Sequence, residues 1–197
     1  MTAAPERVGA IILAGGRSSR YGRDKLAEPI GGRPMLDLAI DAVRAVASDV
    51  VVVTAPDGGR EVPVGVVVAR DATAFEGPLA GLAAGLQALD PANARAVVVG
   101  GDMPALQPTV LGRLLDHLAA ADVAVLEDDE GQRPLPMAIR PISVRLIVDR
   151  LLADGERSLR ALLFEAGAAT IEQATWRRDD PEGQTLRDVD LPEDLPG

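Results

Sequence analysis

The chain lacks cysteine altogether and has very few aromatic residues. Its 197 residues include no cysteine, one tryptophan, one tyrosine and two phenylalanines. Without cysteine, disulfide bonds and cysteine-ligated metals are excluded. The single histidine, His117, falls in a predicted helix and no G-x-S-x-G elbow is present. A histidine-based catalytic triad is therefore not indicated.

An excess of positive charge and long apolar runs are also missing. Acidic residues outnumber basic ones by 30 to 20, which gives a formal net charge of −10. This charge argues against general electrostatic binding of nucleic acid. No apolar run reaches about 18 residues, so we expect no membrane span, and the first residues do not resemble a signal peptide. We therefore expect a cytoplasmic protein.

Short apolar runs alternate with segments of helical periodicity along the whole chain. Hydrophobic residues make up 47% of the sequence, and several apolar runs are continuous, which is typical of strands buried on both faces of a parallel sheet. We predict an α/β fold, a single domain over residues 1–197 with a three-layer, doubly wound, mainly parallel sheet and helices on both faces. The predicted strands are Val8–Leu13, Val50–Thr54, Val64–Ala69, Ala96–Val99, Val123–Leu126, Met137–Ile139 and Ala169–Glu172. The predicted helices are 34–47, 78–89, 108–121, 143–152 and 158–166.

A glycine-rich basic loop follows the first predicted strand. The segment LAGGRSSRYGRDKL, residues 13–26, contains Gly15 and Gly16 followed by Arg20 and Lys25. Glycines allow a bound group to approach the backbone closely, and successive free N–H groups favour anions. The loop matches neither the Walker A pattern nor G-x-G-x-x-G. It indicates phosphate binding, although an ordinary strand-to-helix turn remains an alternative.

Two aspartates follow predicted strands at the edge where ligands bind in open α/β sheets. Asp102 comes directly after a buried strand and two glycines, and the next predicted helix begins too far on, near Pro108, for a capping role. One or two carboxylates with phosphate oxygens and water suit Mg²⁺, so we predict Asp102 as the metal ligand. Asp71 follows another strand and fits a nucleotide contact or a simple turn equally well.

These motifs resemble the signature of the MobA-like nucleotidyltransferases, roughly L-A-G-G-x-S-x-R-M-G-x-D-K. Every fixed position matches except one, where Tyr21 stands in place of methionine. The segments Gly101–Pro104 and Gly77–Gly81 resemble further family motifs in the same order. The resemblance implies a Rossmann-like nucleotidyltransferase fold and transfer of GMP from GTP, with Mg²⁺, to the phosphate of molybdenum-loaded molybdopterin. It also implies protein partners in cofactor delivery.

The resemblance further implies roles for individual residues. Arg20, Lys25 and Asp102 would be catalytic. The nucleotide would be bound by Leu13, Ala14, Gly15, Gly16, Lys25, Thr54, Asp71, Gly77 and Asp102. The acceptor would be bound by Arg157, from a G-E-R segment, and by Asp190, which could also be a second metal ligand. Both Asn positions of the family's C-terminal motif are Asp here, at 188 and 190.

Three functional hypotheses stay open at this point. The first is the guanylyltransferase, which Gly15 favours because in this family Leu-Ala-Gly-Gly accompanies guanine. The second is a relative that uses CTP or a different phosphorylated acceptor. The third is a nucleotide-binding protein that delivers cofactor without catalysis, against which the intact Arg20, Lys25 and Asp102 argue.

Overall fold

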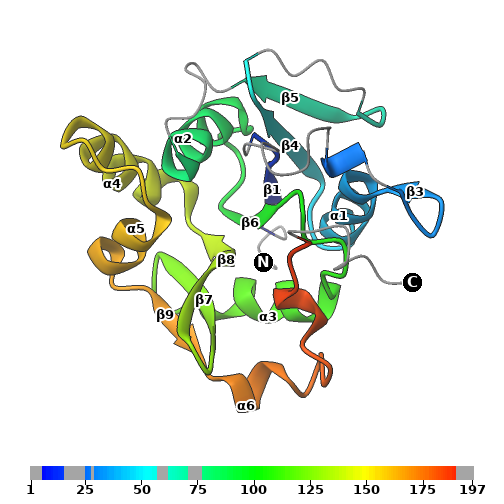
Figure 1. Cartoon of the computed structure of the whole chain (residues 1–197). Helices are drawn as coiled ribbons and strands as arrows, with labels where there is room; N and C mark the ends of the chain where they lie inside the picture. The colour runs from blue at the N-terminus through cyan, green and yellow to red at the C-terminus, as the bar shows by residue number, and fades with distance from the viewer. Residues whose placement is uncertain (1–5, 16–24, 28, 57–61, 71–76, 190–197) are drawn as a thin grey trace, which may run out of the picture.

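A seven-stranded sheet forms the centre of the protein (Figure 1). The computed structural model describes residues 6–15, 25–27, 29–56, 62–70 and 77–189. All strands of the sheet run parallel except β8, which is antiparallel to both of its neighbours, β6 and β7. In spatial order the strands are β5 (Val66–Arg70), β4 (Asp49–Thr54), β1 (Val8–Leu13), β6 (Arg95–Gly100), β8 (Gly131–Ile139), β7 (Val123–Asp128) and β9 (Ala169–Ile171).

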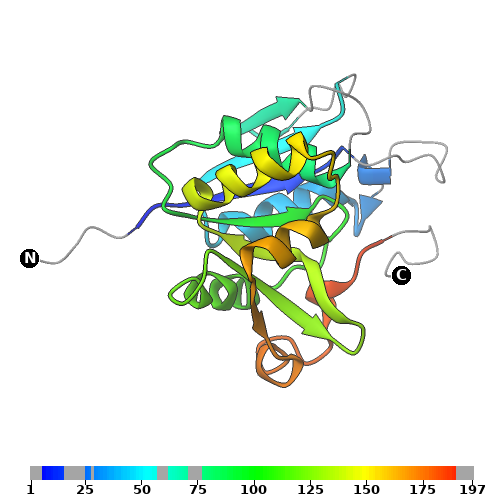
Figure 2. The ribbon, with the colours of Figure 1, turned by 90° about the vertical axis from the view of Figure 1, so that its left-hand side faces the viewer.

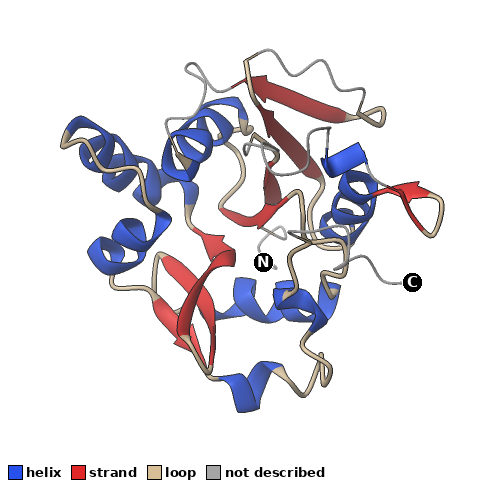
Figure 3. Ribbon diagram, in the orientation of Figure 1, coloured by secondary structure: helices blue, strands red, loops and turns tan. Residues whose placement is uncertain are grey.

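Helices cover both faces of this sheet and give three layers (Figures 2 and 3). On one face, α1 (Met35–Arg44) and α3 (Pro108–His117) share a buried core with Trp176 at the end of α6 (Gln173–Trp176). On the other face, α2 (Pro78–Ala88), α4 (Pro141–Ala153) and α5 (Leu159–Ala166) build a second core. None of the helices in the described part of the chain is long and apolar enough to cross a membrane.

The apolar strands are buried because they contribute to both cores. In β1, Ala10 and Ile12 face the core under α1, whereas Ile11 faces the core under α2. All three side chains are fully buried. Helix α2 lies unusually close to β1, since a Cβ at Gly85 would fall 2.5 Å from Ile11. The continuous apolar run of β1 is therefore covered by helices on both faces of the sheet, and Gly85, which has no side chain, lets α2 pack closely against it.

The predicted fold class is confirmed, and the differences lie at element boundaries. Strand β8 begins at Gly131, six residues before the predicted start, because its first half pairs with the acidic end of β7. Helix α3 ends at His117 rather than near Ala121, and α4 begins two residues early, at Pro141, a residue suited to a first turn. Short elements escaped prediction, namely the β2–β3 hairpin (Pro29–Ile30, Arg33–Pro34), α6, and 3-10 helices at Lys25–Ala27 and Gln184–Leu186.

Candidate active site

The carboxyl ends of β1, β4 and β6 are joined by backbone hydrogen bonds. The Ala14 amide donates to the Val53 carbonyl at 2.8 Å, and the Gly101 amide donates to the Leu13 carbonyl at 2.9 Å. These bonds hold Leu13, Ala14 and Gly15 between the ends of the two neighbouring strands. A Cβ at Gly15 would lie 3.4 Å from the Ala55 nitrogen. The start of the glycine-rich loop is thus packed tightly at the edge where open α/β sheets bind ligands.

Asp102 lies at the same edge, two residues beyond the last residue of β6. Its carboxylate sits close to the backbone, since a Cβ at Gly100 would be 2.5 Å from Asp102 Oδ1. Its carbonyl accepts a 3.1 Å hydrogen bond from the Val189 amide. The next helix, α3, begins at Pro108 as expected, so Asp102 does not cap it. The bond to Val189 brings the C-terminal segment, and Asp188 with it, to the edge of the sheet.

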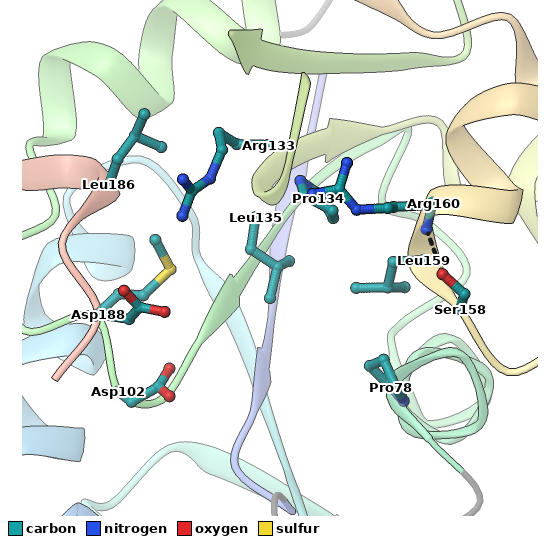
Figure 4. A pocket seen from close by; sticks show the side chains of 11 residues that line it. Pro78, Asp102, Arg133, Pro134, Leu135, Ser158, Leu159, Arg160, Leu186 and Asp188 are labelled. Carbon is teal, nitrogen blue, oxygen red and sulfur yellow. Dashed lines mark hydrogen bonds between the residues drawn. The ribbon is translucent and has the colours of Figure 1, made fainter. Parts of the chain in front are cut away.

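A cavity of about 340 Å³ opens beside Asp102, and we call it the edge cavity (Figure 4). One wall carries the carboxylates of Asp102 and Asp188, and the opposite wall carries Ser158 and Arg160, with Arg133 above. The full lining is Pro78, Asp102, Met103, Arg133, Pro134, Leu135, Ser158, Leu159, Arg160, Leu186 and Asp188. These residues come from five separate segments of the chain, so the cavity exists only in the folded protein.

The middle of β8 shapes the floor of the edge cavity. Its pairing with β7 shifts register: Val125 is opposite Met137, whereas Leu126 is opposite Arg133. Residues 134–136 are therefore left out of the ladder, and Pro134 and Leu135 line the cavity. Irregular pairing of this kind re-aims side chains next to functional sites.

The structure brings together only some of the site residues predicted from the sequence. Leu13, Ala14, Gly15, Thr54 and Asp102 lie at the carboxyl ends of β1, β4 and β6. Lys25 begins the first 3-10 helix, while its side chain lies outside the described residues. Gly16, Arg20, Asp71 and Asp190 also lie outside the described residues.

Thr54 has an unsatisfied hydroxyl. The residue is 3% exposed at the end of β4, and its Oγ1 has no hydrogen-bond partner in the described part of the chain. A buried polar atom without a partner costs about 1–3 kcal/mol. Such an atom at a ligand-binding edge indicates a group that is satisfied when a ligand is present.

Arg157 is engaged with the backbone rather than with the edge cavity. Its Nη1 donates to the Glu156 carbonyl at 2.8 Å and to the Leu152 carbonyl at 3.3 Å. The Arg157 carbonyl accepts a 3.2 Å bond from the Leu79 amide. Its Cβ would lie 2.9 Å from a Cβ at Gly77, where φ is +92°. Gly77 therefore allows the start of α2 to pack against the α4–α5 loop, and Arg157 fastens that loop.

Sequence reasoning missed the role of two cavity residues, Arg160 and Asp188. Ser158 caps α5, with its Oγ accepting from the Arg160 amide at 3.0 Å, which places Arg160 in the first turn of the helix. The serine before an apolar run signals this helix start and could have pointed to Arg160. Position 188 belongs to the family's C-terminal motif, but its place at the edge cavity depends on the bond between Val189 and Asp102.

The acidic wall has the donor set that a divalent cation bound through substrate phosphates requires. No group of three or more His, Cys, Asp or Glu side chains able to hold a metal occurs within the described ranges. Asp102 and Asp188, however, supply two carboxylates to one cavity. Magnesium is commonly bound by one or two carboxylates, with water and phosphate oxygens completing the octahedron. The residues present therefore fit such an ion.

Comparison with known proteins points to one family. A model of the MobA-like NTP transferase domain matches residues 10–171. A probable molybdenum cofactor guanylyltransferase of Mycobacterium avium is 31% identical over 193 residues, covering 96% of this chain and 93% of its own. A molybdenum cofactor guanylyltransferase of Desulfosudis oleivorans is 30% identical over 200 residues, with the same coverage.

Solved structures share the fold. Molybdopterin-guanine dinucleotide biosynthesis protein A of Archaeoglobus fulgidus superposes with a TM-score of 0.75 at 20% identity, covering 95% of this chain and 94% of its own. A cytidylyltransferase of Thermus thermophilus, acting on 2-C-methyl-D-erythritol 4-phosphate, superposes with a TM-score of 0.72 at 20% identity, covering 96% and 95%. A Mycobacterium tuberculosis protein crystallised with manganese superposes at 0.67 with 20% identity, covering 86% and 89%. At these identities the likeness shows the fold alone.

Proposed function

The chain belongs to the MobA-like NTP transferase domain family, and from this premise we propose that it transfers GMP from GTP to the phosphate of molybdenum-loaded molybdopterin, with release of pyrophosphate. The relatives named as molybdenum cofactor guanylyltransferases support this choice of reaction. The observation that carries it in the structure is the position of Asp102, which lines the edge cavity at the carboxyl end of β6.

On the nucleotide side, we assign binding largely to the backbone around the end of β1. The base and the α-phosphate would be contacted by main-chain atoms of Leu13, Ala14, Gly15 and Gly16. The two glycines have no Cβ, so the backbone there can come close to the nucleotide. Thr54 is the neighbouring side chain, and its unpartnered Oγ1 supports a hydrogen bond to the nucleotide. Asp71 and Gly77 are assigned to the same side from the family motif.

Charge neutralisation is the main chemical requirement of the reaction. The acceptor phosphate is already anionic, so transfer to the α-phosphorus needs positioning and charge compensation more than a general base. We assign that compensation to Arg20 and Lys25, with Asp102 and Asp188 as the carboxylates that would hold Mg²⁺. When bound there, the ion would polarise the phosphoryl oxygens and lower the cost of developing negative charge.

The choice of GTP over CTP rests on the curated relatives and on Gly15, because the fold alone does not decide it. Cytidylyltransferases superpose almost as well as the molybdopterin-guanine dinucleotide protein. The proposal is therefore tested first by calorimetric titration with GTP, CTP, ATP and UTP in the presence of Mg²⁺. We expect binding that is selective for GTP.

A second measurement separates the enzyme from a carrier. Pyrophosphate release is followed after adding molybdenum-loaded molybdopterin to the GTP-bound protein. Release that needs both substrates supports guanylyl transfer, whereas preference for CTP would make the protein a cytidylyltransferase. Tight GTP binding without pyrophosphate release would instead indicate a nucleotide-binding delivery protein.

A further inference from the structure

Three arginines lie on or near the wall of the edge cavity that faces Asp102 and Asp188, and they differ in the groups that already neutralise their charge. Arg133 is paired with Asp128 at 3.0 Å and with Glu130 at 3.4 Å. Arg157 donates to two backbone carbonyls and does not line the cavity. Arg160 lines the cavity and has no carboxylate partner within the described ranges. Arg160 is thus the cation of this wall whose charge is least compensated.

Among the described residues, the Arg160 guanidinium makes a single hydrogen bond, and this bond is weak. Its Nη1 donates to the Gln132 carbonyl at 3.4 Å, beyond the usual range of 2.7–3.2 Å. Figure 4 shows the guanidinium beside Pro134, and both residues line the edge cavity. In a chain with ten more acidic than basic residues, a guanidinium left without a carboxylate is poised for an external anion.

Ser158 adds a second donor at the same place. Its Oγ accepts from the Arg160 amide at 3.0 Å, which leaves the hydroxyl proton available to a ligand. Ser158 caps α5 and Arg160 lies in its first turn, and both side chains are opposite Asp102 and Asp188 (Figure 4). An anionic acceptor entering the cavity would meet carboxylates on one wall and a guanidinium with a hydroxyl on the other.

We propose that Arg160, together with the Ser158 hydroxyl, binds the phosphate monoester of the acceptor, and that Arg157 instead positions the loop that carries them. This assignment rests on the proposed function for the identity of the acceptor, but not for the chemistry of the binding group. A planar guanidinium recognises phosphate through two parallel N–H···O bonds. The Arg157 carbonyl joins the α4–α5 loop to α2 by accepting from the Leu79 amide. The Arg157 guanidinium holds the loop itself in shape by donating to the Leu152 and Glu156 carbonyls.

The test compares Arg160→Met, Arg160→Lys, Arg157→Met and the matched exposed control Arg178→Met. Methionine keeps an unbranched apolar stem and removes the charge, while lysine keeps the charge without the planar fork. In steady-state assays at saturating GTP, we expect Arg160→Met to raise the acceptor KM about tenfold or more. Arg160→Lys should fall between wild type and methionine. The dissociation constant of GTP should not change in either variant.

A direct binding arm uses probes that do not depend on turnover. Neopterin phosphate, neopterin and inorganic phosphate are titrated into wild-type protein and into each variant. We expect neopterin phosphate to bind wild type better than neopterin does, and this advantage to be lost in Arg160→Met and retained in Arg178→Met. Loss of the advantage in Arg157→Met but not in Arg160→Met would overturn the assignment, as would equal binding of the two pterins by wild type.

The two arms separate failure of this inference from failure of the proposed function. If wild type bound no nucleotide, or released no pyrophosphate with the acceptor, the proposed function would fail while phosphate binding by Arg160 stayed measurable with neopterin phosphate and inorganic phosphate. If wild type transferred GMP normally and Arg160→Met kept the wild-type acceptor KM, the inference would fail and the proposed function would stand. Preference for inorganic phosphate over neopterin phosphate would support the anion site and contradict a pterin acceptor.

Discussion

The two halves of the central sheet place functional groups at its edge in different ways. In the parallel half, formed by β5, β4, β1 and β6, the residues that directly follow β1 and β6 provide groups at the edge, as with Gly15 and Asp102. In the mixed half, formed by β8, β7 and β9, the cavity groups come from an irregular strand, a helix start and the C-terminal segment. The first arrangement is local in sequence and the second is assembled by tertiary contacts.

In the proposed reaction, this difference would correspond to two chemical tasks. A triphosphate can be held by main-chain N–H groups, and these are available wherever small residues follow a strand. An acceptor must be recognised by its own shape and charge, and this requires side chains that converge from several segments. The reaction needs both sites at one edge, and the Val189–Asp102 bond and the Leu79–Arg157 bond join the two halves there.

The largest effect is expected where the mixed half is anchored to the core. Trp176 is fully buried, and its Nε1 donates to the Glu127 carbonyl at 2.8 Å. Trp176→Ala should lower the free energy of unfolding by about 3–5 kcal/mol, measured by urea denaturation. Trp176→Phe keeps most of the side-chain volume, so its free energy of unfolding should fall by less. Equal losses in the two variants would show that the hydrogen bond rather than the packing stabilises this region.

The next largest effect is expected on turnover, from the carboxylate of Asp102, which follows a strand of the parallel half and lines the cavity formed with the mixed half. Asp102→Ala should reduce turnover by about 10²-fold or more, because charge stabilisation at the reacting phosphates would be lost. The matched control is Asp129→Ala, a change at an exposed aspartate of the β7–β8 turn, which should keep wild-type turnover. Near-normal turnover in Asp102→Ala would remove the proposed active site from the end of β6. The turnover of Lys25→Ala is expected to fall by a similar factor.

The comparison also explains which features could be predicted from the sequence. The strands of the parallel half can be predicted from their continuous apolar runs. The position of Asp102 at the edge can be predicted because it comes just after the run that ends at Gly100. The mixed half was predicted only in outline, because β8 contains prolines and charged residues that obscure its periodicity. Asp188 and Arg160 share a cavity through contacts between distant segments, and such contacts leave no local pattern in the chain.

An intermediate effect would sharpen the nucleotide side of the comparison. Thr54→Val replaces a buried, unpartnered hydroxyl by a methyl group of similar size. We expect the free protein to be as stable as wild type or slightly more stable, since an unsatisfied polar group is removed. The affinity for GTP should fall about tenfold, because a hydrogen bond to the nucleotide would be lost. Thermal denaturation and calorimetry measure the two quantities.

A second buried threonine provides the matched control for this change. The Thr185 Oγ1 accepts a 3.1 Å bond from the Gln107 amide, so this hydroxyl is already satisfied. Thr185→Val should therefore destabilise the protein and leave the affinity for GTP unchanged. If Thr54→Val destabilised the protein to the same degree and bound GTP normally, the Thr54 hydroxyl would have a structural role, and other groups would bind the nucleotide.

The smallest effect concerns the attachment of the C-terminal segment to α3. Arg113 Nε donates to Asp179 Oδ2 at 2.5 Å, and this bond lowers the pKa of Asp179 below its ordinary value of 3.8. A carboxyl group whose pKa is lower in the folded state stabilises the protein above its unfolded pKa, and the stabilisation is lost as the pH falls through the folded value.

Asp179→Asn should therefore lower the free energy of unfolding by at most about 1 kcal/mol at neutral pH, since the pair is partly exposed. The difference between variant and wild type, measured by urea denaturation, should shrink as the pH falls below 3.8 and vanish only below the lowered folded-state pKa of Asp179. A difference that stayed constant into acid would mean that Asp179 acts through packing rather than charge. The polar attachment of the segment that brings Asp188 to the edge cavity would then come from bonds such as Gln107–Thr185 and Val189–Asp102.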